Sequence, residues 1–268
     1  MKGTRFIPKR VSKKIFNLLT PFRVLGWSLI KWTFLSKDKK YAYFQRKRYD
    51  WLANISDEAV VGNYEEHNKW KDYDEFLMKY AYLYKDKLAL DFGTGVGRNI
   101  IRYHDRFRRL DGVDIGSVNI GRARKKLKRH KIDSKLYVNN GFDLSEIRDN
   151  VYGFIFSTIT LQHICCYSTR FNLLKEFYRA LEKGGRISIQ MGFGKTLPNY
   201  SVGYYEDYFN ALKTNGAMDT QISSPEQVGD DLKKIGFEDF EYWIRNAGPG
   251  GGEGIGHEKW IFFTAKKP

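Results

Sequence analysis

Short apolar runs alternate with amphipathic stretches from residue 86 to the end of the chain. This alternation predicts strand–helix–strand units and a parallel sheet. The strands are expected at 87–92, 109–115, 135–140, 152–158, 186–192, 237–245 and 259–267. The helices are expected at 97–106, 117–130, 169–182 and 225–235. The third helix is predicted to stop at Lys183, Gly184 and Gly185.

Only a loop separates the last two expected strands, so they predict an antiparallel hairpin. We therefore expect an α/β, doubly wound, mostly parallel seven-stranded sheet that ends in a C-terminal antiparallel hairpin. The chain divides into a basic, aromatic-rich helical extension (1–55), a helical cap (56–85) and a main domain (86–268). Within that domain, residues 192–224 are too long for an ordinary strand-to-helix connection of about 2 to 6 residues, and we expect a substrate-side insertion.

The first strand leads into a glycine-rich loop, Asp91-Phe92-Gly93-Thr94-Gly95-Val96-Gly97-Arg98. Its backbone N–H groups and the following helix N-terminus can approach a polar or anionic ligand closely. A dinucleotide loop would need glycine where Arg98 stands, and the Gly-Lys-Ser/Thr ending of a phosphate loop is missing. The carboxylate at this loop suits a ligand with an ammonium and a sulfonium group.

The loop resembles the D-x-G-x-G-x-G motif of class I S-adenosylmethionine-dependent methyltransferases of the small-molecule or glycan type (methyltransferase type 11/12-like). Four later features agree with the family in order: Asp114, NNGFDL at 139–144, FSTITLQHI at 156–164 and EFYRALEKGGRISIQ at 176–190. The last stretch lacks the proline usual in the family. The resemblance covers residues 86–267 and implies a Rossmann-like fold and methyl transfer.

The cofactor implied by the resemblance is S-adenosyl-L-methionine. Asp114 ends the second strand, where a carboxylate can accept both ribose hydroxyls. The residues implied to bind the cofactor are Asp91, Gly93, Thr94, Gly95, Gly97, Arg98, Asp114, Ile115, Gly141, Phe142, Asp143 and Ser157.

Methyl transfer is an in-line displacement, so holding the acceptor in place supplies most of the acceleration. A base is needed only for a hydroxyl or a protonated nitrogen. His163 is the first catalytic candidate because it follows the fourth strand, and its alternative role is to orient the loop or the substrate. His257 is the second candidate, in a glycine-rich loop (246–258) that either overhangs the site or is a plain hairpin tip.

Polar and aromatic residues near the expected acceptor side are candidates for substrate binding. They are Gln162, Gln190, Tyr204, Tyr205, Asn215, Asp219 and Glu253. The tyrosines, amide and carboxylate of the insertion suit sugars, and a self-packed lid is the alternative. In the cap, Tyr64, His67 and Trp70 either cover the cofactor or pack on the sheet.

Charge is concentrated in the N-terminal extension. The chain carries a net charge of +15, and residues 1–50 supply 14 − 2 = +12 of it. Basic clusters and tryptophans within residues 9–48 predict contact with an anionic membrane surface, with packing on a protein as the alternative. Because the remaining chain is nearly balanced, nucleic acid is a less favoured partner.

These observations favour methyl transfer to a small molecule or glycan, such as a lipid-linked sugar or a surface polysaccharide precursor. An RNA methyltransferase that uses the basic arm and a non-catalytic cofactor-binding scaffold are the alternatives. Two adjacent cysteines build no disulfide framework, so we expect a cytoplasmic protein, peripheral at the inner membrane face if the extension binds lipid. The five histidines show no metal-ligand spacing, and we expect no metal.

Overall fold

The structure is a computed structural model that describes residues 36–61, 71–198, 201–209, 218–246 and 257–268. Residues 9–35 of the stretch 9–48 that is expected to contact a membrane, and the residues Tyr64, His67 and Trp70 of the expected cap, lie outside the described residues.

All seven expected strands are present, and two short strands of the insertion join the same sheet. The nine strands found in the described residues are β1 (Leu88–Phe92), β2 (Arg109–Asp114), β3 (Leu136–Val138), β4 (Tyr152–Thr158), β5 (Leu181–Phe193), β6 (Ser201–Gly203), β7 (Asp219–Ile222), β8 (Glu238–Asn246) and β9 (Lys259–Lys266). The doubly wound, mostly parallel architecture is confirmed, because the pairings among β1 to β7 are all parallel. The expected C-terminal antiparallel hairpin is confirmed as well, since β9 pairs antiparallel with both β5 and β8.

The expected helices are present within a few residues of their predicted bounds. Helices and helical turns are α2 (Lys37–Ile55), α3 (Asp57–Val61), η1 (Tyr73–Leu77), η2 (Ala81–Tyr84), α5 (Arg98–Tyr103), η3 (His104–Arg106), α6 (Ser117–Arg129), η4 (Thr160–His163), α7 (Tyr167–Ala180) and α8 (Pro225–Ile235). The predicted stop of the third helix at Lys183–Gly185 was wrong. α7 ends at Ala180 and β5 begins at once, with an irregular register opposite Tyr152 and a left-handed backbone at Gly184.

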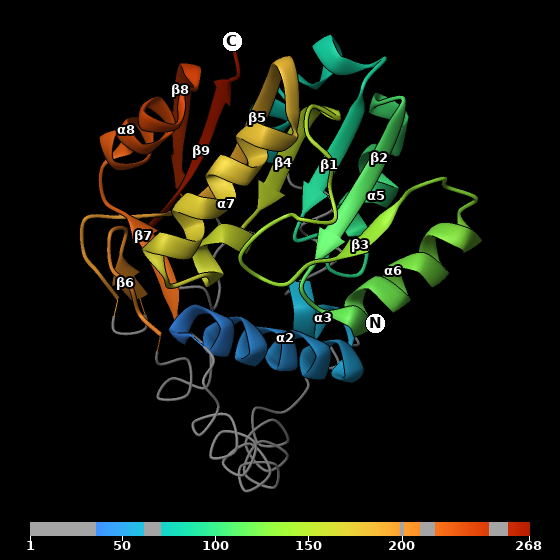
Figure 1. The fold of residues 1–268 in the computed structure, drawn as a ribbon, viewed down its shortest axis with the longest axis horizontal. Coiled ribbons are helices and arrows are strands. Elements are labelled where there is room, and N and C mark those ends of the chain that lie inside the picture. Colours follow the sequence, from blue (N-terminus) through green and yellow to red (C-terminus); the bar gives the residue numbers. More distant parts are fainter. Residues whose placement is uncertain (1–35, 62–70, 199–200, 210–217, 247–256) are drawn as a thin grey trace, which may run out of the picture.

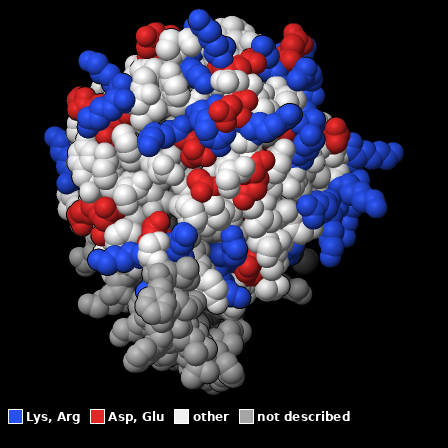
Figure 2. Space-filling view, in the orientation of Figure 1, with Lys and Arg blue, Asp and Glu red and all other residues white. Residues whose placement is uncertain are grey.

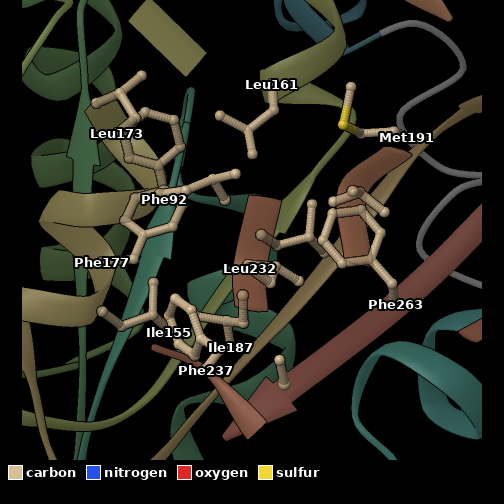
Figure 3. Close-up of a cluster of buried hydrophobic side chains, with 14 of the residues drawn as sticks. Phe92, Ile155, Leu161, Leu173, Phe177, Ile187, Met191, Leu232, Phe237 and Phe263 are labelled. Carbon is tan, nitrogen blue, oxygen red and sulfur yellow. The ribbon is translucent and has the colours of Figure 1, made fainter. Parts of the chain in front are cut away.

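Alternate residues of the central strands face two separate cores. Ile155 of β4 lies in one core with Leu173 and Phe177 of α7 (Figure 3), while Phe154 and Phe156 lie in the other. The second core is covered by η1, η2 and α5. Because both faces of the sheet are buried, ligands have access only at the strand ends, and doubly wound sheets bind them at the carboxyl ends.

The insertion strand β7 takes the place of β4 beyond the carboxyl end of β4. β4 pairs with β5 as far as Thr158 opposite Gln190, and β7 pairs with the next part of β5 at Gly192 and Phe193. Both strands run parallel to β5. Since β9 occupies the other edge of β5 over this stretch, β7 continues the line of β4 and carries its residues over the carboxyl edge.

Helix α2 lies across the carboxyl ends of β1, β2 and β4 (Figure 1). Polar contacts hold it there: Arg46 donates to the carbonyl oxygens of Ile115 (3.1 Å) and Asn139 (2.7 Å). Asp50 accepts from the backbone N–H of Val118 (2.9 Å) at the start of α6. A carboxylate at a helix N-terminus is favourable, so this contact stabilises α6 and fixes α2 together.

Lysines and arginines project from the side of the molecule formed by α6, whereas both signs of charge are mixed over the rest of the face in Figure 2. The exposed residues of this helix include Arg124, Lys125, Lys128 and Arg129. Within the described part of the chain, no helix has the length and apolar character needed to cross a membrane.

Candidate functional site

The glycine loop has a backbone that only glycine adopts readily. Gly93, Gly95 and Gly97 have φ angles of 79°, 54° and 86°. A Cβ at Gly93 would lie 1.9 Å from Oγ1 of Thr160, so the start of η4 packs directly on the loop. Glycine therefore lets the end of β4 and the end of β1 approach each other.

Asp114 ties this loop to the end of β2. Its carboxylate accepts from the backbone N–H groups of Gly95 (2.9 Å) and Gly116 (2.7 Å), and from the side chain of Asn119 (3.0 Å). Burial raises the pKa of Asp114, and these hydrogen bonds oppose the rise. The carboxylate thus shapes the pocket as well as facing it.

A cavity of about 380 Å³ lies between these loops and α2. Its floor is formed by the glycine loop and the residues after β2, β3 and β4, and its roof by α2 and α3. The lining includes Tyr41, Ala42, Gln45, Arg48, Tyr49, Leu52, Phe92, Gly93, Thr94, Gly95, Arg98, Asn99, Asp114, Ile115, Asn119, Asn139, Gly141, Thr158, Thr160 and His163.

Polar atoms without hydrogen-bond partners gather around this cavity. They are buried, they lack a partner among the described residues, and they are Asp91 Oδ2, Thr94 Oγ1, Arg98 Nη1, Asn99 Oδ1, Asn119 Oδ1 and Asn139 Oδ1. Buried polar atoms are normally satisfied, so this set marks the place of a ligand with several polar groups. An amino acid joined to a nucleoside, as in S-adenosylmethionine, offers donors and acceptors for such a set.

Asp91 stands directly behind the cavity wall and is fully buried. Burial raises the pKa of its carboxyl to about 7, although Thr94, Asn99 and Arg98 act in the opposite direction. Its oxygen Oδ1 accepts a long hydrogen bond of 3.4 Å from the side chain of Asn99. The carboxyl therefore lacks a cation close enough to hold it ionised.

His163 of η4 also lines the cavity, and it contacts Asp219 of the insertion strand β7. Nδ1 of His163 lies 2.6 Å from Oδ1 of Asp219. Burial would raise the pKa of Asp219, but the neighbouring imidazoles of His163 and His257, which hydrogen-bond to its carboxylate, hold it below its usual range. The ring of Tyr49 lies 6.3 Å from that of His163, between centroids. The cavity thus ends at an imidazole that a buried carboxylate orients.

His257 lies behind Asp219 and does not line the cavity. Its Nδ1 is 2.9 Å from Oε1 of Gln221 and its Nε2 is 3.3 Å from Oδ2 of Asp219. Gln162 donates to the same Asp219 oxygen at 3.2 Å. Both His257 nitrogens are engaged, so the proposed direct base role for His257 does not fit the structure.

The residues predicted to bind the cofactor fall into two groups. Those that line the cavity are Gly93, Thr94, Gly95, Arg98, Asp114, Ile115 and Gly141. Those that stand behind the lining are Asp91, Gly97, Phe142, Asp143 and Ser157. Ser157 donates to the carbonyl oxygen of Phe92, and Asp143 accepts from Asn140 within its own loop, so these two shape the walls.

The structure corrects most of the predicted substrate contacts. Tyr204 is buried against Tyr167 and Asp231, and Tyr205 donates to the carbonyl oxygen of Gln227 on α8. Neither lines the cavity, because the insertion packs these side chains on the helices α7 and α8. Asp219 and Gln162 hold His163 and the end of β5 instead of an acceptor.

The three remaining candidates for substrate binding are Gln190, Asn215 and Glu253. Gln190 is fully buried in β5 outside the cavity lining, and both of its amide atoms lack a partner among the described residues. Asn215 and Glu253 lie outside the described residues. In the part of the chain that is described, no cluster of three histidine, cysteine or carboxylate side chains is arranged to hold a metal ion.

The α2 wall was missed by sequence reasoning, which sought the cover in residues 56–85. The residues of α2 in the lining are Tyr41, Ala42, Gln45, Arg48, Tyr49 and Leu52. Their spacing is that of one helix face, which is the signal that could have identified them. Tyr41 also accepts from the backbone N–H of Cys165 (2.9 Å) and donates to the carbonyl oxygen of His163 (3.0 Å), linking the roof to η4.

Residues 90–189 match a protein family described as a methyltransferase domain. Phosphoethanolamine N-methyltransferase 2 of Caenorhabditis elegans is 24% identical over 191 residues, which cover 70% of this chain and 39% of that protein. This chain therefore spans well under half the length of that relative.

Two solved structures share the fold. Haemonchus contortus phosphoethanolamine N-methyltransferase 2, in complex with phosphomonomethylethanolamine and S-adenosylhomocysteine, has a TM-score of 0.56 at 19% identity, covering 74% of this chain and 53% of that one. Geranyl diphosphate C-methyltransferase from Streptomyces coelicolor A3(2), in complex with S-adenosyl-L-homocysteine, has a TM-score of 0.58 at 16% identity, covering 79% and 80%.

Proposed function

Because this chain carries a methyltransferase domain of the class I, S-adenosylmethionine-dependent family, we propose that it transfers a methyl group from S-adenosylmethionine to a small-molecule or glycan acceptor. The observation that carries the proposal is one cavity that is lined both by the glycine loop and Asp114 and by His163, which Asp219 holds.

The cofactor would be held by the residues whose polar atoms lack partners. Asp91, Thr94, Arg98 and Asn99 surround the expected amino-acid end, and Asn139 lies at the expected nucleoside end. Asp114, whose carboxylate already accepts hydrogen bonds from Gly95, Gly116 and Asn119, also lines the expected nucleoside end. When bound, S-adenosylmethionine supplies an electrophilic methyl group on a sulfonium. The rigid loop orients it, because Gly93 and Thr94 both donate backbone hydrogen bonds to the carbonyl oxygen of Val113.

His163 would act on the acceptor. Its Nδ1 is held by Asp219, and its ring belongs to the cavity wall, so Nε2 is the nitrogen available to an acceptor proton. An acceptor hydroxyl or ammonium must lose a proton to become a nucleophile, and a histidine so oriented can take it. Tyr49 and Gln45 flank this end of the cavity and would position the acceptor.

The acceptor class is the finer part of the proposal. Arg48 adds a cation to the cavity wall, and two of the similar proteins are named for phosphoethanolamine and geranyl diphosphate. This favours a phosphorylated small molecule. A phosphorylated sugar as acceptor would agree with the glycan hypothesis. Tyr204 and Tyr205 no longer support that hypothesis, because both pack on the helices α7 and α8.

The second part of the proposal is contact with a membrane surface, which the outer face of α2 supports. Lys39, Tyr43 and Lys47 are exposed at successive turns, and the Lys47 ammonium lies 5.6 Å from the Tyr43 ring centroid. A basic and aromatic stripe suits anionic headgroups. Cosedimentation of the full chain with phosphatidylglycerol vesicles, lost for Lys39→Glu/Lys47→Glu and absent with phosphatidylcholine, would support contact. Equal binding to both lipids would refute it.

The function is tested first by calorimetric titration of S-adenosylmethionine and S-adenosylhomocysteine into the full chain. We expect binding that Asp114→Ala abolishes and that Asp133→Ala, an exposed carboxylate outside the site, leaves intact. Radiolabelled methyl transfer would then be measured to phosphoethanolamine, prenyl diphosphates, phosphorylated sugars, glycans and RNA. Binding without turnover would identify a scaffold, and turnover on RNA alone would refute the small-molecule proposal.

A further inference from the structure

The side chains behind His163 form a buried network whose hydrogen-bond directions can be assigned. Its members are His163 and Gln162 of η4, Asp219 and Gln221 of β7, and His257 at the start of β9. Amide and imidazole orientations follow from partners that can only donate or only accept. Three of the partners here are backbone groups of that kind.

Gln221 is fixed by backbone carbonyl groups. Its side-chain NH₂ donates to the carbonyl oxygens of Gly194 and Thr196, both at 2.8 Å. Its remaining oxygen, Oε1, can only accept, and it lies 2.9 Å from Nδ1 of His257. Nδ1 of His257 must therefore carry a proton.

Asp219 fixes the other nitrogen of the same ring. Gln162 must direct its oxygen to the backbone N–H of Gly192 (2.9 Å), so its NH₂ donates to Oδ2 of Asp219. That oxygen also lies 3.3 Å from Nε2 of His257. An ionised carboxylate only accepts, so Nε2 of His257 carries a proton as well. A ring with both nitrogens protonated is a cation.

The resulting charges leave His163 neutral. Asp219 contributes one negative charge, and the His257 imidazolium balances it inside the protein. His163 then needs only the proton on Nδ1 that bonds to Asp219 at 2.6 Å, and Nε2 keeps its lone pair on the cavity side.

We propose that His257 is a positioning residue, held as an imidazolium that neutralises Asp219, so that His163 rests as a neutral base with Nε2 toward the acceptor. The inference rests on the proposed function for its catalytic meaning, but the charge state of His257 follows from the hydrogen-bond directions and from the ionised carboxylate of Asp219, without reference to turnover. The ring of His257 is held in place by close packing on β5, because a Cβ at Gly192 would lie only 2.4 Å from it.

Other ionisable groups face the network from α2, α7 and the loop after η4. Burial raises the pKa of Tyr41 and Tyr49 above the usual range and that of Cys165 to about 11, so these three are neutral near pH 7. Arg170 adds a cation that contacts the carbonyl oxygen of Ile164 and donates to Oγ1 of Thr220 (2.8 Å).

The first test is nitrogen NMR of histidine-labelled full chain at pH 7.5, with His257→Gln and His163→Gln used to assign the signals. We expect both nitrogens of His257 to be protonated and only Nδ1 of His163. This readout needs no turnover, so an inactive protein with this pattern would refute the proposed function while supporting the His257 assignment. A neutral, singly protonated His257 would overturn the inference.

The second test is the pH dependence of kcat/KM in His257→Gln, which keeps an amide donor near Asp219 and removes the charge. The uncompensated carboxylate should favour protonated His163, moving the acid limb to higher pH by on the order of one unit. Trp260→Phe is the matched control, because Trp260 packs 5.8 Å from the His257 ring between centroids and carries no charge. An acid limb unmoved in His257→Gln would refute the proposal, and a variant that fails to fold leaves the NMR test decisive.

Discussion

Asp91 makes the unliganded protein sensitive to pH. The side chain is fully buried, Oδ2 has no partner among the described residues, and burial raises its pKa to about 7. An aspartate in the unfolded chain has a pKa of about 3.9. Between those two values the folded state holds a proton that the unfolded state has lost.

The free energy of unfolding must then fall as the pH rises from about 4 to about 7. Each unit of pKa difference corresponds to about 1.4 kcal/mol, so the shift of about three units corresponds to about 4 kcal/mol above pH 7. Asp91→Asn cannot ionise and keeps an oxygen for the bond from Asn99. We expect this variant to gain about 2 to 3 kcal/mol relative to the native chain between pH 5 and pH 8.

Urea unfolding of both proteins at pH 5, 6, 7 and 8, without cofactor, measures this difference. Asp105→Asn is the control, because Asp105 is an exposed carboxylate near the end of α5 and should give no comparable trend. A constant offset between Asp91→Asn and the native chain at all four pH values would refute the reasoning, since it would mean that Asp91 does not carry the proton.

Cofactor binding should respond in the opposite sense. Hydrogen bonds to charged groups contribute about 1.5 to 3 kcal/mol, so Asp91→Asn should weaken S-adenosylmethionine binding about 10- to 100-fold. In the native chain the affinity should rise from pH 6 to pH 8, as the cofactor ammonium favours the ionised carboxylate. Calorimetry in two buffers of different ionisation enthalpy would detect the released proton. A variant that is both more stable and a tighter binder would contradict the assignment of Asp91.

Three further substitutions test the site and its roof. Gly93→Ala should abolish cofactor binding in calorimetry because its Cβ would strike Thr160, whereas Gly184→Ala, with nearly the same φ (80° against 79°) and open space, should cost only about 1 kcal/mol of strain in urea unfolding. Asp50→Asn should speed S-adenosylhomocysteine release several-fold in stopped-flow measurements, since it weakens the contact between α2 and α6, and an unchanged rate would argue against α2 as the roof. Tyr205→Phe should leave KM for the acceptor unchanged, because the lost hydroxyl bonds on α8, and a raised KM would restore it as a substrate contact.

The sheet, the helices and the cofactor end of the site were predictable because their signals are local. The glycine loop is eight residues long, and Asp114 ends a strand that its own apolar residues predict. Helix bounds were less certain where a strand follows directly, as at Ala180, since local propensity does not decide which element takes the residues between them.

The acceptor end depends on contacts between distant segments. Asp219 reaches His163 across 56 positions, from a four-residue strand that pairs only with the last residues of β5 and with β6. Neither its sequence, DTQI, nor its position in a long insertion predicts a buried strand. A hydrogen bond from Arg170 of α7 to Thr220 holds β7 in place. A buried arginine on a helix interrupts the hydrophobic periodicity, so the sequence does not predict this contact. The sequence therefore predicted Asp219 as a substrate contact, whereas in the structure its carboxylate contacts His163 of the same chain.

The roof of the cavity was missed for a physical reason that bears on its function. A helix that packs on an apolar core shows a hydrophobic stripe, and sequence reasoning relies on that stripe. The inner face of α2 instead presents Tyr41, Gln45, Arg48 and Tyr49 to the cavity, and its outer face carries lysines, so the sequence of the helix resembles that of a charged extension. Its position is set by polar contacts to loop backbones, such as those of Arg46. The polar residues of α2 break the hydrophobic stripe, so its packing could not be predicted from the sequence. The same residues line the cavity and would contact the cofactor and the acceptor.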